Sequence, residues 1–319
     1  MILVVALNPA LDVTHRLDHV DWAGVNRPAA VHVSPGGKGL NVARVLRSLG
    51  ADVLLAGLAG GHTGNVVRSA LRDTGIPACL VPTSGDTRRT FAVVDAGRGE
   101  TAIFNEPGPR ISPDEYTAFL QRYADAIAHS SAVVLSGSLP PGVPDSAYAD
   151  LIGLAAGAGV PSLLDTSGPA LVAGVAAGPA IVKPNLAELA AAVGCELPRP
   201  AGRPSEQCAD VLQAAGQLRA AGAGAVVVTL GADGLLALTE GGCWHAVTPA
   251  VSGNPTGAGD AAAAALALGL SAGSPWAGRL AQAAALGAAA VAAPVAGEYD
   301  DVVYRQALAA VRVSNWEES

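Results

Sequence analysis

Short, mostly apolar runs alternate along the chain with longer segments whose apolar residues have helical spacing. The runs are ILVVAL (2–7), VLLAGLAG (53–60), AVVLSG (132–137), PSLLD (161–165), AIVKPN (180–185) and AVVVTLG (225–231). Strands that are apolar on both faces are typical of a parallel sheet covered by helices on both sides. The pattern therefore predicts an α/β fold, namely a three-layer α/β/α sandwich with a mainly parallel central sheet.

The helical spacing lies in the segments 41–50, 65–75, 147–159 and 206–222, and most of these end at glycine. Two other segments, about 12–34 and 87–106, have the pattern of short alternating strands, and the second turns at 97–99. We expect both to form a small β-sheet lid over the carboxyl ends of the main strands, where open α/β sheets bind ligands. The Pro-rich stretch 196–207 predicts a surface loop.

The composition favours a single domain over residues 1–319 and excludes several kinds of partner. Half of the residues are hydrophobic and 14% are charged, which indicates a large core. A net charge of −8 argues against nucleic acid and against an anionic membrane as partners. The beginning of the chain lacks a basic signal region, and the alanine-rich stretches 261–270 and 284–296 predict buried helices, not membrane spans.

The cysteines point to a reducing compartment. Cys79, Cys195, Cys208 and Cys243 lie far apart and form no C-x-x-C pair, so we interpret them as buried thiols and not as a disulfide set or a zinc site. The histidines show no metal-binding spacing either. Together these features predict a cytoplasmic enzyme or binding protein.

The sequence Gly257-Ala258-Gly259-Asp260 begins an alanine-rich helix after the turn residues 254–256. An aspartate in a first helical turn usually interacts with the helix dipole and nothing more. The glycines favour a second interpretation, because they leave several N–H groups open to a close anion. An acid beside an anion site then has a function, such as accepting a proton during the reaction.

Lysine is almost absent from the chain, and both lysines lie in motifs. Of 19 basic residues only Lys38, in GGKGLN (36–41), and Lys183, in KPNLAE (183–188), are lysine. Either could be a solvated surface residue, but both together are better explained by anion binding. The arginines Arg27 and Arg88 lie in the two lid segments, where surface charge and phosphate binding are equally compatible with the sequence.

Two phosphate-binding motifs are absent from the sequence. It has neither GxxxxGK[ST] nor a strand-linked GxGxxG, so a nucleotide would be held in another way. Asn185 and Glu188 have the spacing of a capping box at a helix start. Their alternative interpretation is that they face a phosphate-bound magnesium ion, directly or through water. Ser136 and Ser138, in SGSLPPG, have no hydrolase elbow around them.

These motifs together resemble the PfkB, or ribokinase-like, carbohydrate kinases over essentially the whole chain. The matches are GGKGLNVARVL (36–46) and NPTGAGDAAAAA (254–265), supported by ALNPALD (6–12), TRRT (87–90), NEPGP (105–109), DTSGPAL (165–171) and VTLGADG (228–234). The resemblance is greatest to the branch of 1-phosphofructokinases, tagatose-6-phosphate kinases and minor 6-phosphofructokinases. It implies a ribokinase-like fold, ATP and Mg²⁺, and a phosphosugar substrate.

The resemblance also implies a role for each matching position. Asp260 would be the base, and the amides of Gly257, Ala258 and Gly259 would form an anion hole for the transferred phosphoryl group. The sugar hydroxyls would be held by Asp12, Gly36, Gly37, Asn41 and Ser138, and the sugar's phosphate by Lys38, Arg27 and Arg88. ATP would face Lys183, Asn185, Glu188, Thr229, Gly231 and Gly234, with the magnesium near Asn185 and Glu188.

The chain departs from the family pattern at two positions. Thr90 stands where relatives often have Asn, and Asn254 where many ribokinases have Asp, which leaves one sugar contact and a monovalent-cation site open. Fructose 1-phosphate and tagatose 6-phosphate are the expected substrates, with fructose 6-phosphate close behind. A kinase for an unphosphorylated sugar or nucleoside is the alternative, and a non-catalytic sugar- or nucleotide-binding regulator is a third. Lids of this family often pair, so we expect a homodimer with Trp22 and Val31 at the contact.

Overall fold

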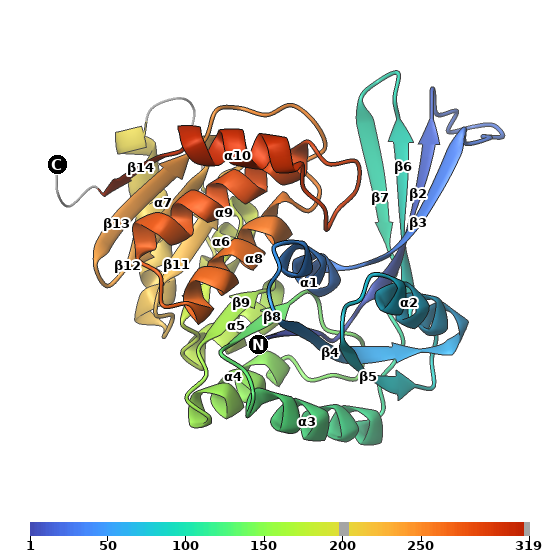
Figure 1. The fold of residues 1–319 in the computed structure, drawn as a ribbon, viewed down its shortest axis with the longest axis horizontal. Coiled ribbons are helices and arrows are strands. Elements are labelled where there is room, and N and C mark those ends of the chain that lie inside the picture. Colours follow the sequence, from blue (N-terminus) through green and yellow to red (C-terminus); the bar gives the residue numbers. More distant parts are fainter. Residues whose placement is uncertain (198–203, 316–319) are drawn as a thin grey trace.

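The computed structural model of the chain describes residues 1–197 and 204–315. Within them a ten-stranded sheet and a four-stranded sheet form two separate parts of the molecule (Figure 1). The strands of the larger sheet follow one another across it as β14 (Arg312–Asn315), β13 (Gly242–Val247), β12 (Leu235–Thr239), β11 (Val226–Thr229), β10 (Ile181–Val182), β9 (Ser162–Asp165), β8 (Ala132–Ser136), β1 (Ile2–Ala6), β4 (Val53–Gly60) and β5 (Ala78–Thr83).

The larger sheet is mainly parallel, as the sequence predicts. From β11 to β5 each neighbouring pair is parallel, whereas β11–β12, β12–β13 and β13–β14 are antiparallel. The antiparallel edge and strand β5 are not foreseen by the sequence analysis. Strand β10 is shorter than the expected run 180–185, because Pro184 lacks an N–H for the ladder and Asn185 already caps the next helix.

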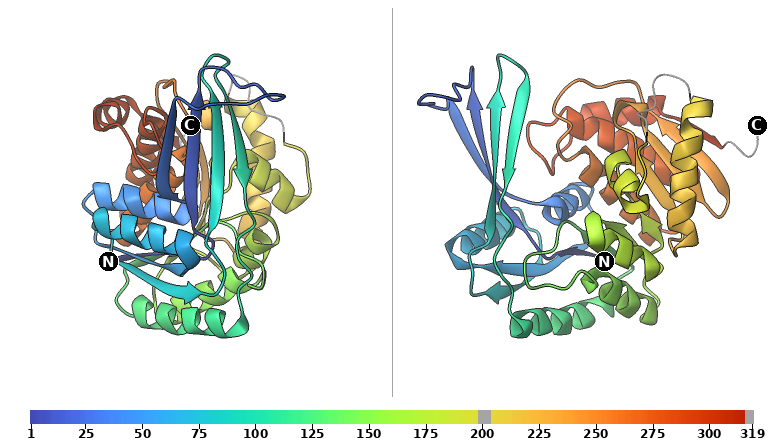
Figure 2. Two further views of the ribbon diagram at one scale, coloured as in Figure 1. Left: turned by 90° about the vertical axis from the view of Figure 1, so that its right-hand side faces the viewer. Right: turned by 180° about the vertical axis from the view of Figure 1, so that it is seen from behind.

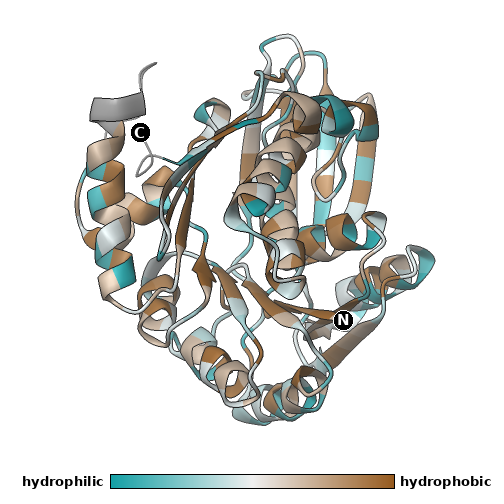
Figure 3. Cartoon of the chain, turned by 60° about the vertical axis from the view of Figure 1, so that its left-hand side comes forward, coloured by the Kyte–Doolittle hydropathy of each residue, from teal (hydrophilic) through white to brown (hydrophobic). Residues whose placement is uncertain are grey.

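Helices cover both faces of this sheet. One layer contains α3 (Pro113–Ile127), α4 (Ala147–Gly157), α5 (Gly168–Ala176), α6 (Leu186–Val193) and α7 (Pro204–Ala220), and the other α1 (Lys38–Ser48), α2 (Gly61–Asp73), α8 (Ala258–Ser271), α9 (Trp276–Val291) and α10 (Asp301–Ala310). The alternation along β1 shows the arrangement, since Leu3 and Val5 pack toward α3–α7 and Ile2 and Val4 toward the other layer. Apolar strands between helices are visible in Figure 3.

Helix α8 lies in the middle of its layer and is buried along most of its length. Residues 261–267 are all buried, and six of the seven are alanine. Alanine allows α8 to approach the sheet, α1 and α9 closely, because it has no bulky side chain. The predicted buried helix 261–270 is confirmed by α8, whereas the predicted helix 284–296 ends at Val291 and continues as a loop. Among the described residues no helix is both long and apolar enough to cross a membrane.

The two strand-rich segments form the separate small sheet that the sequence predicts, which we call the lid. Its strand order is β3 (Ala30–Gly36), β2 (Ala10–Leu17), β6 (Arg88–Asp95) and β7 (Glu100–Asn105). The central pair β2–β6 is parallel and the outer pairs are antiparallel. Figure 2 shows the lid projecting from the main body beside α1 and α2.

The buried Asp95 holds the tip of the lid together. Its carboxylate accepts hydrogen bonds from the amides of Val20, at 2.9 Å, and Arg98, at 3.0 Å. The amide bonds are the main cause that holds the pKa of Asp95 below its ordinary value. The loop after β2 is thus fastened to the turn between β6 and β7.

Two expectations need correction. The predicted surface loop 196–207 is too long, because α7 begins at Pro204, a favoured first helical residue, while 198–203 lie outside the described residues. The expectation of four buried thiols is wrong for all but Cys208: Cys195 is exposed, and Cys79 and Cys243 are half-buried. Short helices and strand ends near the surface leave these three side chains in partial contact with solvent.

Candidate active site

A cavity of about 1690 Å³ lies between the lid and the carboxyl ends of the main parallel strands. Such a position at the strand ends is where open α/β sheets bind ligands. Most of the residues predicted from the sequence line it, although they come from distant parts of the chain. These are Asp12, Gly37, Lys38, Asn41, Arg88, Ser138, Lys183, Asn185, Glu188, Thr229, Gly257, Gly259 and Asp260.

The start of α8 presents unpaired N–H groups to the cavity. Gly257 caps the helix with φ 89°, a left-handed conformation that favours glycine. Among the described residues, the amides of Gly257, Gly259 and Asp260 have no protein acceptor. Ala258 differs from the prediction, because its N–H donates to the Pro255 carbonyl oxygen at 3.1 Å and closes the turn before the helix. The free amides at this helix start are suited to an anion.

Asp260 lies in the first turn of α8 with 7% of its surface exposed. Its Oδ2 accepts a hydrogen bond of 2.8 Å from Asn41 Nδ2. Burial, together with the nearby charge of Asp165, raises the pKa of Asp260 to about 6, although Asn41 and the two lysines act in the opposite direction. At neutral pH the carboxylate is therefore ionised but can readily accept a proton.

Both lysines of the chain are held by one carboxylate, Asp165 at the end of β9. Lys38 Nζ lies 3.2 Å from its Oδ1 and Lys183 Nζ 3.2 Å from its Oδ2, and Asp165 itself is fully buried. Burial alone would raise the pKa of Asp165, but the two lysines hold it below its ordinary value. Burial alone would likewise lower the pKa of Lys38, but Asp165 and Glu188 raise it, so Lys38 stays charged.

Glu188 joins this cluster while also capping α6. Its Oε1 lies 3.0 Å from Lys38 Nζ, and its Oε2 accepts the Asn185 amide at 2.9 Å. The Asn185 side chain accepts the Glu188 amide at 2.8 Å in return. The capping box predicted as one interpretation is therefore present, and it places Glu188 on the cavity wall.

The oxygen donors present fit a magnesium ion only as a partner of bound phosphates. Within 1–197 and 204–315 no cluster of three His, Cys, Asp or Glu side chains is placed to hold a metal ion. Glu188 and Asn185 offer hard oxygen ligands, but each is already engaged in the capping box. Magnesium is commonly bound through one or two carboxylates plus substrate phosphates, so Glu188 would hold such an ion together with a nucleotide.

Asp12 and Arg88 form the wall of the cavity on the lid side. Gly36 makes room for Asp12, since a Cβ at Gly36 would lie 1.9 Å from Asp12 Oδ2. Burial raises the pKa of Asp12, against the effect of Thr90 and Arg88. Arg88 donates to the carbonyl oxygens of Asn8, at 3.1 Å, and Glu106, at 3.2 Å, which leaves part of its guanidinium fork for a ligand.

Among the described residues, three buried amide or carboxylate oxygens in the cavity residues have no hydrogen-bond donor. They are Asn8 Oδ1, Asp12 Oδ1 and Asn41 Oδ1. A buried polar atom without a partner costs about 1–3 kcal/mol, so such atoms usually meet a ligand or water. A ligand with several hydroxyl groups would supply the missing donors.

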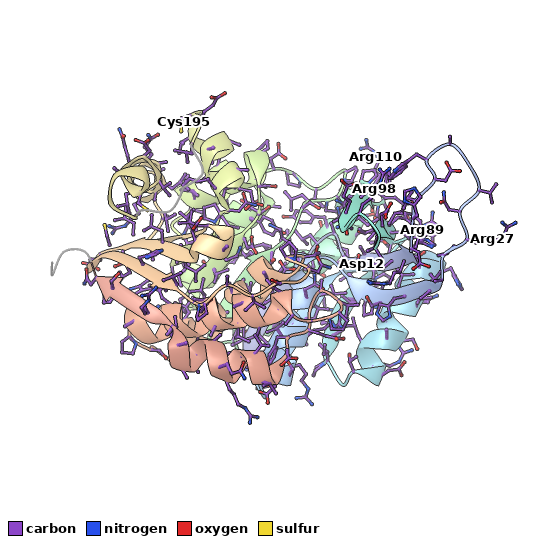
Figure 4. All side chains as sticks on the ribbon, turned by 90° about the horizontal axis from the view of Figure 1, so that it is seen from above. Asp12, Arg27, Arg89, Arg98, Arg110 and Cys195 are labelled. Carbon is purple, nitrogen blue, oxygen red and sulfur yellow. The ribbon has the colours of Figure 1, made fainter. Side chains whose placement is uncertain are left out.

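Other predicted residues lie outside this cavity. Arg27 is in the exposed loop between β2 and β3 and points away from Asp12 (Figure 4), so the chain does not bring it to the phosphate-binding cluster expected for it. Gly231 and Gly234 do not line the cavity; they form the turn between β11 and β12. Gly234 has φ 86°, and a Cβ there would lie 2.1 Å from the Ala246 carbonyl oxygen. Their expected contact with ATP stays a prediction.

The sequence analysis assigned no role to two residues that matter here, Asp165 and Asn8. Asp165 ends an apolar strand, so its position marked it as a residue at the carboxyl edge of the sheet. Asn8 follows β1 in the same way, and its Nδ2 donates to Ser138 Oγ at 3.1 Å. Polar residues directly after buried strands were the signal that could have identified both.

We expect the substitution Asp165→Asn to destabilise the protein strongly. The variant would leave the buried Lys183 without its charged partner, and breaking one side of a buried ion pair costs about 3–5 kcal/mol. Because the pKa of Asp165 is depressed, this contribution is present at neutral pH and is lost only as the pH falls below the ordinary value of 3.8. Urea unfolding at pH 7 measures the change in the free energy of unfolding.

The control is Asp125→Asn, an exposed acid on α3, which should change the free energy of unfolding by less than about 0.5 kcal/mol. Equal stability of Asp165→Asn and the control would contradict the role given to Asp165.

Comparison with known proteins agrees with this geometry. The family model described as pfkB family carbohydrate kinase matches residues 7–300. Phosphofructokinase-2 from Escherichia coli is similar in its tetrameric inhibited form, with 32% identity, a TM-score of 0.86 and coverage of 97% of this chain and 98% of that one. The structure of its complex with fructose-6-phosphate has 31% identity and a TM-score of 0.85, with coverage of 97% of this chain and 98% of that one.

Two other solved structures extend the comparison. A possible 1-phosphofructokinase from Thermotoga maritima has 25% identity and a TM-score of 0.85, with coverage of 98% of this chain and 99% of that one. Ribokinase from Arabidopsis thaliana shares the fold. It has 20% identity and a TM-score of 0.72, with coverage of 96% of this chain and 98% of that one. The fold is therefore ribokinase-like, and the chain belongs to the pfkB family of carbohydrate kinases, which are ATP-dependent phosphotransferases.

Proposed function

We propose that the protein transfers the γ-phosphoryl group of ATP, with Mg²⁺, to a hydroxyl group of a ketohexose phosphate. The observation that carries the proposal is that Asp260, whose pKa is raised to about 6, lies in one cavity with the free amides of Gly257 and Gly259. A base and an anion site side by side are what phosphoryl transfer to an alcohol requires. We infer that the molecule acts as a single domain.

The acceptor side of the cavity supports a sugar as the substrate. Asn8, Asp12 and Asn41 offer acceptor oxygens without donors, and Arg88 retains free N–H groups beside them. The hydroxyl groups of a sugar would donate to these acceptor oxygens, and a phosphate group would accept from the N–H groups of Arg88. Ser138, on the same wall, accepts a hydrogen bond from Asn8 and keeps its own O–H for the ligand.

Among ketohexose phosphates, fructose 6-phosphate, fructose 1-phosphate and tagatose 6-phosphate are the candidates. Fructose 6-phosphate gains support from phosphofructokinase-2, which has been solved in complex with it, and fructose 1-phosphate from the possible 1-phosphofructokinase. Both comparisons concern other proteins, so the three compounds are tested together.

The residues act through position and charge. Asp260 accepts the proton of the attacking hydroxyl group, while Asn41 fixes the orientation of its carboxylate. The free amides at the start of α8 stabilise the negative charge on the transferred group, and Lys183 lies beside them, 3.5 Å from the Cβ position of Gly259. Glu188 and Asn185 would hold magnesium together with ATP, and the ion would supply positive charge to the phosphates. The lid would exclude water from the cavity.

The substitution Asp260→Asn should lower kcat by about 10²- to 10⁴-fold, the usual contribution of a general base. In the wild type, kcat/KM should fall below pH 6 as Asp260 takes up a proton. Coupled ADP release against the three ketohexose phosphates, free fructose and ribose measures both effects. ATP binding without transfer to any of them would favour a binding function instead.

The same variant should be more stable than the wild type at neutral pH. Because the folded protein holds the pKa of Asp260 above its value of 3.8 in a model compound, the ionised form costs folding free energy above pH 6. Removing the charge should therefore stabilise the fold by about 3 kcal/mol, and the gain should vanish below pH 4. Thermal unfolding at pH 7.5 and pH 3.5 checks the sign, and a destabilised variant at pH 7.5 would contradict the raised pKa.

We expect Arg88→Ala to raise the KM for the sugar phosphate by about 10- to 100-fold, the effect of losing a charged hydrogen-bonding partner, with little change in the KM for ATP. Arg122→Ala, an exposed arginine on α3, serves as the control. If Arg88→Ala kept the wild-type KM for every phosphorylated sugar, Arg88 would not bind the substrate's phosphate. That result would favour the alternative of an unphosphorylated substrate.

We further propose a homodimer that forms through the outer face of the lid. Along β2 the residues Asp12, Thr14 and Arg16 face the cavity, so the alternate positions face outward. The outward face contains exposed apolar side chains, with Val31 at 51%, Val33 at 50% and Phe104 at 53% exposure, and Trp22 and Val25 lie exposed in the neighbouring loop. Exposed apolar side chains that share one face of a sheet often mark a surface that binds another protein.

The substitution Val33→Asp should convert the dimer into monomers, because an unpaired charge would be buried in the contact. Sedimentation velocity at several concentrations measures the change. Val302→Asp, which alters a residue of 64% exposure on α10, should leave the oligomeric state unchanged. A wild type that is monomeric at all concentrations would exclude the proposed dimer.

A further inference from the structure

One face of α1 extends beyond the predicted site residues to a third side chain, Arg44. Lys38, Asn41 and Arg44 follow one another at intervals of three residues, so they lie on the same face of the helix. Lys38 contacts Asp165 and Glu188, and Asn41 contacts Asp260. Arg44 hydrogen-bonds to none of these three carboxylates and instead binds the loop 292–298 between α9 and α10.

Arg44 holds this loop at two points. Its Nη1 donates to the Ala296 carbonyl oxygen at 2.8 Å, and its Nη2 lies 2.7 Å from Glu298 Oε1. The Arg44 side chain is only 12% exposed. A guanidinium group that binds a carbonyl and a carboxylate through two nitrogens fixes both the distance and the orientation of the loop.

The loop in turn packs against the start of α8. A Cβ at Gly257 would lie 3.0 Å from Ala296 Cα, and a Cβ at Gly297 would lie 3.0 Å from Arg44 Nη1 and from Asn41 Oδ1. Residues 296–297 thus lie between α1 and the N-terminus of α8 without space for further atoms. Gly257 carries one of the unpaired amides that face the cavity.

A second contact fastens the other end of the same segment. The Asn254 amide donates to the Val291 carbonyl oxygen at 2.9 Å, where the loop begins. The turn that precedes α8 is therefore held at both ends by 291–297. Residues 291–296 and Glu298 also line the cavity, and the loop lies on the side of the main body that faces the lid (Figure 1).

We propose that Arg44 is a positioning residue for phosphoryl transfer, because it holds the 292–298 loop against Gly257 and so fixes the free amides at the start of α8. Arg44 makes its hydrogen bonds to Ala296 and Glu298 and none to Asp260, Asp12 or Arg88 among the described residues, although its charge helps to lower the pKa of Asp12 against burial. Its main effect is therefore expected on the transferred group and on the nucleotide. This inference rests on the kinase function proposed above.

The test compares Arg44→Ala, Arg44→Lys and Glu298→Gln with the wild type. Arg44→Ala should lower kcat by about 10- to 100-fold and raise the KM for ATP. Each tenfold loss in kcat corresponds to about 1.36 kcal/mol of lost stabilisation of the transition state. The KM for the sugar phosphate should change by less than about twofold, and the acidic limb of the pH profile should stay near pH 6 because Asp260 is untouched. Arg44→Lys should recover part of kcat, and Glu298→Gln, which keeps the bond to Ala296, should lose least.

Hydrogen–deuterium exchange gives a readout that does not depend on turnover. In Arg44→Ala, peptides covering 291–299 and 253–261 should exchange faster together by about tenfold, while peptides from β1 and α3 should not change. The matched control is Arg47→Ala, an exposed arginine on the same helix, which should behave like the wild type in both measurements.

Two results would overturn the inference. Unchanged exchange in both peptides would show that Arg44 does not hold the loop, whatever happens to activity. An increase of KM for the sugar phosphate alone would show that Arg44 acts on the acceptor. If the wild type transferred phosphate to no sugar phosphate, the proposed function would fail, and the exchange comparison would still decide whether Arg44 fixes the start of α8.

Discussion

The buried Asp165 is the interaction on which the rest of the site depends. It neutralises Lys38 and Lys183 together, and these lysines come from helix α1 and from the end of strand β10. Without it, two positive charges would lie near each other in a cavity wall with little water, which is costly. The shared carboxylate therefore allows the protein to keep two cations at a place where phosphate charge would arrive.

The same cluster explains why Asp260 can act as a base near neutral pH. Asp165, Glu188 and Asp260 oppose two lysines, so the cluster carries one excess negative charge while Asp260 is ionised. Uptake of one proton by Asp260 makes it neutral. Burial and Asp165 favour that uptake, whereas Asn41 and the lysines limit it, and the balance raises the pKa only to about 6 and no further.

The sequence predicted what depends on local pattern. Apolar runs identified six parallel strands, and alternation identified the lid, because both periodicities are local properties of the chain. The antiparallel edge β12–β14 was missed. Strands β12 and β13 form a tight hairpin that was not recognised in the sequence, and β14 pairs with β13 across a long separation in sequence. The motifs identified Lys38 and Asp260 as site residues. The side chains that shift the pKa of each could not be predicted from the spacing of residues in the sequence. Asp165 and Lys38 are 127 residues apart.

At single residues, too, the predictions differ from the structure where three-dimensional geometry and not local sequence pattern decides what an atom contacts. Arg27 was assigned to the phosphate site from its residue type, yet the loop after β2 carries it to the outside of the lid, where Asp95 fastens the base of that loop. Ala258 was assigned to the anion site from its place in the motif, yet the turn before α8 uses its amide. A motif specifies which residues are near a ligand, whereas backbone geometry decides which of their atoms remain free to bind it. In a site built from amides and shared charges, that second condition determines the chemistry, and it becomes visible only in three dimensions.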